Sequence, residues 1–274
     1  MTICLVSCQN AAEVTPESEE PTAEAEEPAI ELITEEDAAV PFEQFVFQDS
    51  TALIPGDSLT PWAFYQVKTL IPHAENAKLN RLINRTLGQS IAGDDYPMVP
   101  TNPALHLRAA ARNHLLRYRK QEIDTVMLRE EHAAYASQHD YETEVMLNKA
   151  NLVSLAAFHY YFTGGVHGNY ETTLYNFSVE PPKKLTYDDL FIPGTASAIA
   201  QLMTDYAQKT EMPVTDDITA PTKNVGLTDT AVIFNYPPYE IASYADGEQL
   251  FVLTYGELMP YLTEEAKALI APLK

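Results

Sequence analysis

The chain has 274 residues, of which 46% are apolar and 10% aromatic, enough to bury the core of one large domain or two small ones. Its formal net charge is -22, and residues 1–40 hold 11 acids and no Lys or Arg, so 28 acids and 17 bases remain for residues 41–274. A nucleic-acid partner needs a basic stripe that displaces counterions from phosphates, and the one basic cluster is modest. Its members are Arg108, Arg112, Arg117, Arg119 and Lys120. The composition therefore disfavours nucleic acid and favours salt-sensitive encounters with cationic partners.

The first eight residues hold both cysteines of the chain, Cys4 and Cys8, so we expect no disulfide and no thiolate metal site in the body. The Leu-Val-Ser-Cys sequence that ends at Cys8 resembles the lipobox at which bacterial lipoprotein precursors are cleaved and acylated. We therefore expect residues 1–8 to be a shortened lipoprotein signal, with Cys8 as the lipidated residue. The expected location is the cell envelope, at the outer membrane or surface of a Gram-negative bacterium, held by a lipid anchor.

Residues 9–40 are rich in Glu, Pro, Ala and Thr and nearly lack aromatic residues. Such a segment cannot bury enough apolar surface to offset its conformational entropy, so it is predicted to be disordered. Repulsion among its acids would keep it extended, as an acidic tether between the membrane and the body.

Apolar periodicity predicts the elements of the body in chain order. A strand is expected at residues 62–71, because apolar and polar residues alternate up to Pro72. A stripe of Leu and Ile predicts a helix over 75–92, and helical spacing resumes after Pro103, as one helix or as two broken near Lys120. The later segments are strands at 142–149, 152–162, 170–179, 231–235 and 250–255, and helices at 195–209 and from Thr263 onward.

Helices and strands are segregated along the chain rather than strictly alternating, and the first three of the later strands predict an antiparallel meander. The expected fold class is α+β, with an antiparallel sheet and helices packed on one face, in a two-layer sandwich. Residues 41–140 and 141–274 are expected to be two parts of one continuous globular body.

A glycine-rich turn between two predicted strands is the most specific local pattern. Its glycines supply positive φ angles and close backbone approach, and His167 lies at its tip. His167 is interpreted as a turn histidine that bonds nearby backbone, as a ligand contact or as a metal ligand. Downstream tyrosines among prolines suit either a recognition surface or core packing. The candidate binding surface comprises Gly164, Gly165, His167, Gly168, Tyr170, Tyr236, Tyr239 and Tyr244.

Four motifs in the second half resemble the domain of unknown function DUF3298. They are the Gly-Gly-Val-His-Gly turn at 164–168, Leu-Thr-Tyr-Asp-Asp-Leu-Phe at 185–191, Tyr-Glu-Ile-Ala-Ser-Tyr-Ala-Asp-Gly at 239–247 and Thr-Tyr-Gly-Glu-Leu at 254–258. The region 62–136 is similar, in architecture alone, to the DUF4163 (PdaC/RsiV-like) module that precedes that domain. Members include extracytoplasmic lipoproteins, the non-catalytic part of a peptidoglycan deacetylase and the lysozyme-binding sensor of an anti-sigma factor. The resemblance implies a non-catalytic envelope domain that binds or senses peptidoglycan, another glycan, or a cationic protein such as lysozyme.

An enzymatic function is the competing hypothesis. Thr186-Tyr187-Asp188-Asp189 superficially resembles the metal-binding Thr-Phe-Asp-Asp of polysaccharide deacetylases, but that metal site also needs a His-x-x-x-His pair, which this sequence lacks. The tetrapeptide is better interpreted as a helix start with a capping Thr or Asp. We therefore predict a non-catalytic protein with no catalytic residue, metal or cofactor. A metal-dependent deacetylase or hydrolase and a structural surface lipoprotein are the alternatives.

Overall fold

The computed structural model describes residues 32–33, 37–57, 59–98 and 101–273, and these residues form one compact unit. Cys8, the predicted signal and most of the predicted tether lie outside the described residues. The end of that tether is ordered, which corrects the prediction of disorder up to residue 40. Val40 is fully buried, and its backbone exchanges two hydrogen bonds with the side chain of Asn148, at 2.9 and 2.7 Å. Burial of this apolar residue offsets the entropy of ordering it.

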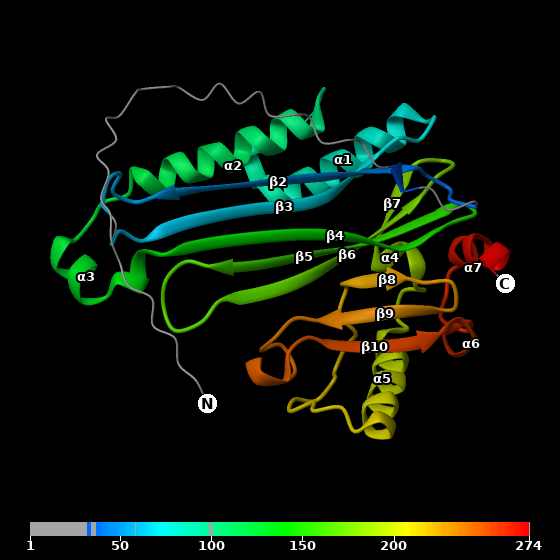
Figure 1. Ribbon diagram of the computed structural model, residues 1–274. Helices are drawn as coiled ribbons and strands as arrows, with labels where there is room; N and C mark the ends of the chain where they lie inside the picture. Colours follow the sequence, from blue (N-terminus) through cyan, green and yellow to red (C-terminus); the bar gives the residue numbers. More distant parts are fainter. Residues whose placement is uncertain (1–31, 34–36, 58, 99–100, 274) are drawn as a thin grey trace, which may run out of the picture. The chain divides into compact units, whose positions relative to one another are not determined.

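A seven-stranded sheet runs through the body, with its strands in chain order across the sheet (Figure 1). Its members are β1 (Leu32–Ile33), β2 (Phe42–Ala52), β3 (Trp62–Pro72), β4 (Ser137–Lys149), β5 (Leu152–Phe162), β6 (Asn169–Ser178) and β7 (Lys183–Leu185). The predicted meander of β4, β5 and β6 is confirmed, whereas β2 was not foreseen. The sheet is mixed rather than wholly antiparallel, because β3 and β4 pair in parallel.

The connection from β3 to β4 crosses one face of the sheet and carries its helices, α1 (Ala77–Ala92) and α2 (Pro103–Arg119). Asn76 and Asn102 cap the amino ends of the two helices by accepting a backbone hydrogen bond. Buried side chains of both helices pack against β2 and β3 and form two apolar clusters. The helical region after Pro103 is broken at Lys120, and the chain continues as α3 (Thr125–Glu130), so the two-helix alternative is correct.

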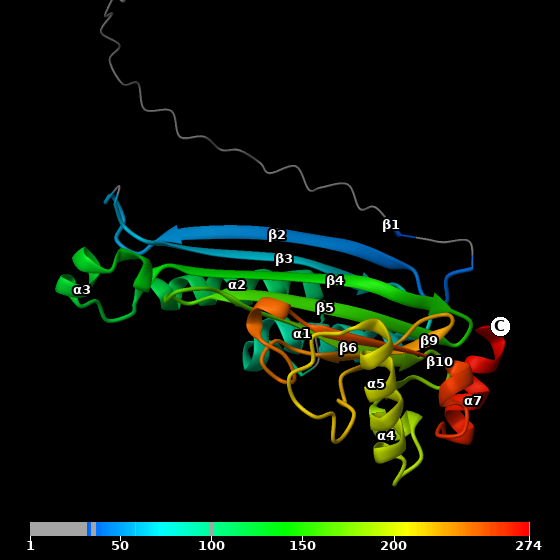
Figure 2. The ribbon, with the colours of Figure 1, turned by 90° about the horizontal axis from the view of Figure 1, so that it is seen from below.

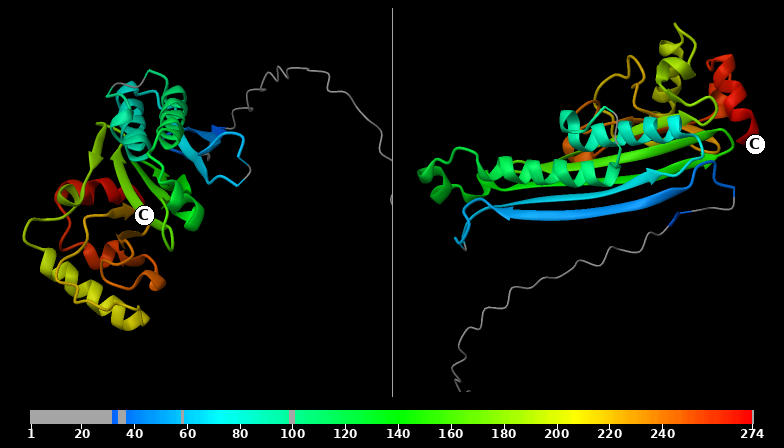
Figure 3. Two further views of the ribbon diagram at one scale, coloured as in Figure 1. Left: turned by 90° about the vertical axis from the view of Figure 1, so that its left-hand side faces the viewer. Right: turned by 90° about the horizontal axis from the view of Figure 1, so that it is seen from above.

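A second sheet and a further set of helices lie on the opposite side of the main sheet (Figure 3). The second sheet has the order β10-β9-β8, and its pairs are antiparallel. Its strands are β8 (Val225–Leu227), β9 (Ala231–Tyr236) and β10 (Gln249–Thr254), and the helices are α4 (Tyr187–Leu190), α5 (Ala196–Thr210), α6 (Tyr255–Leu258) and α7 (Glu264–Ile270). The 3-10 turns are η1 (Gly93–Asp95), η2 (His132–Tyr135), η3 (Tyr244–Asp246) and η4 (Ala271–Leu273). The α+β class is confirmed, and this third layer adds to the two expected.

A buried polar junction joins the two sheets. Asn176 of β6 donates to the carbonyl of Val225 at 2.7 Å and accepts from the backbone N–H of Leu227 at 2.9 Å and from the hydroxyl of Ser154 at 2.8 Å. Asn176 and Ser154 are both almost fully buried. The first strand of the small sheet is therefore fixed to the large sheet by hydrogen bonds shielded from water, which supplement apolar packing.

Replacing Asn176 with Leu is expected to lower the free energy of unfolding by roughly 1–3 kcal/mol, because the carbonyl of Val225 would lose a buried partner. Asn113→Leu, on the exposed side of α2, is the matched control and should change it by less than about 0.5 kcal/mol. Chemical denaturation of both variants measures the difference. Equal effects would contradict a structural role for the junction.

Candidate functional site

One face of the large sheet is left open over β2, β3 and the adjoining half of β4, on the side where the small sheet covers β6 (Figure 2). From Trp62 to Val67 the side chains of β3 alternate between exposed and buried, so Trp62, Phe64 and Gln66 lie on this open face. Strand register places five polar side chains in one line across five strands. In order they are Gln48, Gln66, Asp140, Tyr160 and Tyr170.

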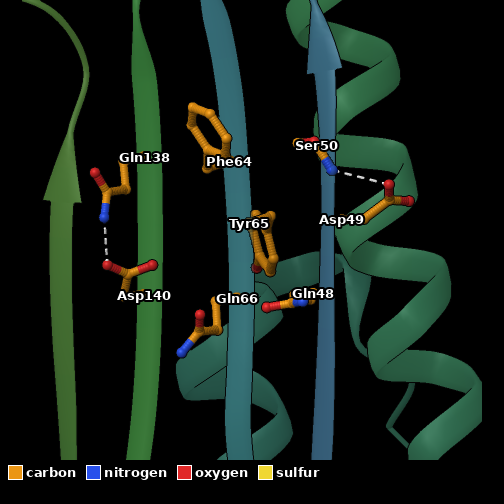
Figure 4. A pocket seen from close by; sticks show the side chains of 8 residues that line it. All are labelled: Gln48, Asp49, Ser50, Phe64, Tyr65, Gln66, Gln138 and Asp140. Carbon is orange, nitrogen blue, oxygen red and sulfur yellow. Dashed lines mark hydrogen bonds between the residues drawn. The ribbon is translucent and has the colours of Figure 1, made fainter. Parts of the chain in front are cut away.

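A hollow of about 660 Å³ occupies this face (Figure 4). Its walls carry amide, carboxylate and hydroxyl groups from three neighbouring strands, and the side chain of Gln138 donates to that of Asp140. Its floor includes the buried Tyr65, whose hydroxyl donates to the carbonyl of Ile91 on the helix side. The lining residues are Gln48, Asp49, Ser50, Phe64, Tyr65, Gln66, Gln138 and Asp140.

Aromatic side chains flank the hollow and are exposed. Trp62 and Phe64 are 46% and 51% exposed, and their rings stack at 6.3 Å between centroids. Phe158 is exposed further along the same face and contacts the ring of Tyr170 at 6.2 Å. Exposed aromatic rings beside convergent polar groups form a surface that can stack against a flat apolar ligand face while bonding to its hydroxyl or amide groups.

The glycine-rich turn adjoins this face through Tyr170. Gly164 has φ +85°, and a Cβ there would collide with the carbonyl of Ala134 in η2, so the position requires glycine. His167 is exposed; its Nδ1 bonds the carbonyl of Gly168 at 2.8 Å, in agreement with the interpretation as a turn histidine. Gly168 is buried because the ring of Tyr160 lies against it.

Two of the predicted tyrosines complete a cluster with His167. Tyr244 stacks on the imidazole at 4.3 Å and donates to the carbonyl of Gly168 at 2.6 Å, and Tyr239 stacks on Tyr244 at 5.4 Å. Tyr239 is 62% exposed at φ +72°, a left-handed conformation that is strained for an aromatic residue. The cluster therefore has rigidly held rings at the edge of the open face.

The structure brings most of the predicted surface together but corrects one member. Gly164, Gly165, His167 and Gly168 lie in one turn, and Tyr170, Tyr239 and Tyr244 lie against or beside that turn. Tyr236 is 3% exposed in the core, where its hydroxyl donates to the carbonyl of Ala220, so it is not part of the surface. The residues that sequence reasoning missed are Gln48, Trp62, Phe64, Gln66, Gln138 and Asp140. Two aromatic residues on the polar face of the predicted strand 62–71 were the available signal.

The Thr-Tyr-Asp-Asp segment forms a capped helix start, as predicted. Thr186 and Asp189 make a capping box at α4, and the carboxylate of Asp189 also pairs with Lys183 at 2.9 Å. Hydrogen bonds from Thr186 and Lys183 hold the pKa of Asp189 below its usual value, although burial acts in the opposite direction. Asp188 is exposed and pairs with Lys223 at 2.9 Å. In the described ranges, no group of three or more His, Cys, Asp or Glu side chains is arranged to hold a metal ion.

A cluster of histidines lies on the helix-covered face, behind the open one. His139 Nδ1 and His159 Nε2 are 3.2 Å apart, and the ring of His114 from α2 lies 4.6 Å from that of His139. Tyr141 stacks on His159 at 4.0 Å. Burial, together with the neighbouring His114 and His159, lowers the pKa of His139 to about 4, and burial lowers that of His159 to about 4. The hydrogen bond needs at least one neutral ring, so the cluster is built for the uncharged state.

Residues 188–256 match the family model described as "Protein of unknown function (DUF3298)". These residues form a DUF3298 domain. The glycine-rich turn lies outside the matched residues, and the DUF3298 domain contributes Tyr239 and Tyr244 to the cluster around it. No curated protein matches the chain.

Solved structures of two other proteins share the fold. A member of the DUF3298 family from Bacteroides fragilis NCTC 9343 is 22% identical, with a TM-score of 0.76 over 86% of this chain and 99% of that one. A DUF3298 family protein from Pseudomonas aeruginosa PAO1 is 18% identical, with a TM-score of 0.57 over 84% and 97% of the two chains. At these identities the likeness extends to the fold. It reaches well beyond residues 188–256, so the N-terminal half belongs to the shared architecture.

The histidine cluster makes stability depend on pH. The folded pKa values of about 4 lie below the ordinary 6.5. The unfolded chain therefore takes up protons that the folded chain does not, and the free energy of unfolding should fall by roughly 2–4 kcal/mol between pH 6.5 and 4. Chemical denaturation across this range measures the slope. The double variant His139→Asn, His159→Asn should flatten this slope. The control His73→Asn, at an exposed histidine that hydrogen-bonds Glu43, should leave most of the slope. An unchanged slope in the double variant would contradict this account.

Proposed function

We propose that this protein is a non-catalytic binding protein of the bacterial cell envelope, and that its open sheet face binds a glycan such as a peptidoglycan fragment. The observation that supports this proposal is the line of Gln48, Gln66 and Asp140 beside the stacked Trp62 and Phe64. Sugar rings present C–H groups on one face and hydroxyls at their edges, so they suit an aromatic platform bordered by amide and carboxylate groups. The likeness of the N-terminal half to the DUF4163 module belongs to the same proposal.

A cationic protein such as lysozyme is the second candidate partner. Asp140, Glu142 and Glu144 follow one another along the open face of β4. Glu142 is paired with Lys68, which leaves the other carboxylates of this row to attract a basic partner. Such binding would be fast and strongly weakened by salt, whereas glycan stacking would depend little on salt.

Trp62 is the only tryptophan of the chain, so its fluorescence reports on this face directly. Titration of the full chain with muropeptides and with chitooligosaccharides should change the emission. Phe64→Ala and Asp140→Asn should each weaken glycan binding by about tenfold, because the first removes a stacking contact and the second removes a charged hydrogen bond. Leu250→Ala, on the exposed face of β10, is the control and should bind normally.

Retention of lysozyme on the immobilised full chain across a salt series separates the two partners, because the tryptophans of lysozyme would mask the emission of Trp62. Binding of lysozyme alone, lost at high salt and weakened by Asp140→Asn but not by Phe64→Ala, would favour the cationic protein. Release of acetate or of sugar fragments in the titrations would instead favour the deacetylase or hydrolase. No response to any of these probes would refute the binding proposal and leave a structural surface protein.

The proposed location is the outer membrane or cell surface, with Cys8 acylated. No helix in the part of the chain that the structure describes is long and apolar enough to cross a membrane. Mass spectrometry of the amino terminus of the native protein should find a mature chain that begins at lipid-modified Cys8. Cys8→Ser should release the protein into the soluble fraction, and Cys4→Ser should not. An unmodified native terminus would contradict the anchor.

A further inference from the structure

The helix layer on the covered side of the sheet is basic, although the protein is acidic. α1 carries three Lys or Arg residues and α2 carries four, and neither helix contains an acid. These seven residues are a large share of the 17 bases of the chain, set against 39 acids elsewhere. They are Lys78, Arg81, Arg85, Arg108, Arg112, Arg117 and Arg119, and Lys120 follows directly. We call the outer surface of α1 and α2 the basic helix face.

Most apolar residues of both helices are turned to the sheet, which leaves several bases of this face exposed to solvent. Arg81, Arg112 and Arg119 are exposed. The guanidinium of Arg108 is fixed above the rings of Phe45 and Phe47, at 5.4 and 5.5 Å from their centroids. Within the described residues, Arg117 is the one base of the two helices in an ion pair, with Asp95 at 2.7 Å.

Exposed leucines are interleaved with these bases along α2. Leu105 and Leu116 are 59% and 50% exposed, and Leu116 lines a hollow of about 250 Å³ together with Arg112 and Arg119. Asp49 also borders that hollow, and it is the one acid among its lining residues. A helix surface that mixes Arg with Leu matches the interface of an anionic bilayer, where bases meet phosphates and leucines reach the boundary of the acyl chains. A nucleic-acid backbone offers no apolar layer to receive those leucines.

We infer that the basic helix face is a docking surface for an anionic phospholipid bilayer. α1 and α2 lie together over one face of the sheet (Figure 3), so their bases meet the bilayer along a surface about 25 Å long. The acids elsewhere on the protein do not prevent this contact, because exposed charges more than about 8 Å away are screened at physiological salt. Docking through this face would turn the open sheet face away from the membrane.

Cosedimentation of the full chain with vesicles tests the inference, with Cys8→Ser so that no acyl chain contributes. The protein should bind vesicles that contain phosphatidylglycerol, bind vesicles of phosphatidylcholine much more weakly, and lose binding as salt is raised. The variant Arg81→Gln, Arg85→Gln, Arg112→Gln, Arg119→Gln should weaken binding by about fivefold for each base removed. The matched control makes the same change of net charge away from this face and should bind vesicles as well as the unchanged chain does. It is Lys149→Gln, Lys209→Gln, Lys223→Gln, Lys267→Gln.

A second variant distinguishes a bilayer from other polyanions. Leu105→Ser with Leu116→Ser keeps every charge and should weaken vesicle binding severalfold. Circular dichroism confirms that each variant is folded. The inference is overturned if the unchanged chain does not bind anionic vesicles, or if the control loses as much binding as the four-arginine variant. It is also overturned if the chain binds a DNA duplex more tightly than vesicles and the leucine variant binds both normally. This result is independent of glycan binding, which is read from Trp62 on the opposite face.

Discussion

The parallel pairing of β3 with β4 is the constraint on which the surfaces of this body depend. Parallel neighbours cannot be joined by a hairpin, so the chain from Pro72 to Ser137 must cross a face of the sheet, and it does so as α1 and α2. Their apolar stripes cover most of that face over β2 and β3. The opposite face of the same strands receives no such cover, because the small sheet packs mainly on β6. The crossover thereby decides which side is apolar and which stays open.

Strand register converts this arrangement into a specific surface. Gln66 is paired with Gln48 on one side and with Asp140 on the other, so their side chains share a face and a level. A slip by one residue would bring Tyr65 to the open side and bury Gln66 among leucines. The buried junction at Asn176 has a similar effect on the small sheet, since its three hydrogen bonds are satisfied in one alignment only. Buried hydrogen bonds therefore fix the strand alignment, and the alignment determines which polar side chains are exposed.

Much of the fold follows from periodicity, and the misses have identifiable causes. The strand that begins at Trp62 alternates as far as Thr69, and the helix α1 keeps its period, so both were predictable. The strand β2 was not predictable, because Phe42 and Phe45 are both buried although 42 is an even and 45 an odd position. Their burial breaks the period of two that a strand normally shows. Tyr236 was misplaced because tyrosine suits surfaces, yet Val232 and Phe234 are buried at the same alternation and the pattern continues to Tyr236.

The candidate site could be predicted only in part, because it is assembled across strands. The turn that carries His167 was predictable, since its residues are neighbours in the sequence, and Tyr239 and Tyr244 were recognised from their own motif. The line from Gln48 to Tyr170 joins five strands whose order depends on the parallel pair, and no local pattern in the sequence specifies that pair. Trp62 and Phe64 were visible on the polar side of their strand, but their partners were not.

The close contact between Gly164 and the carbonyl of Ala134 joins two regions that are distant in the chain. Ala134 ends the long crossover that begins with α1, whereas Gly164 opens the turn that carries His167. The contact leaves no space for even one methyl group, so the turn cannot advance toward the crossover without displacing it. A side chain at this position would therefore displace either the turn that carries His167 or the end of the segment that carries α1 and α2, so one glycine maintains the fit between the two.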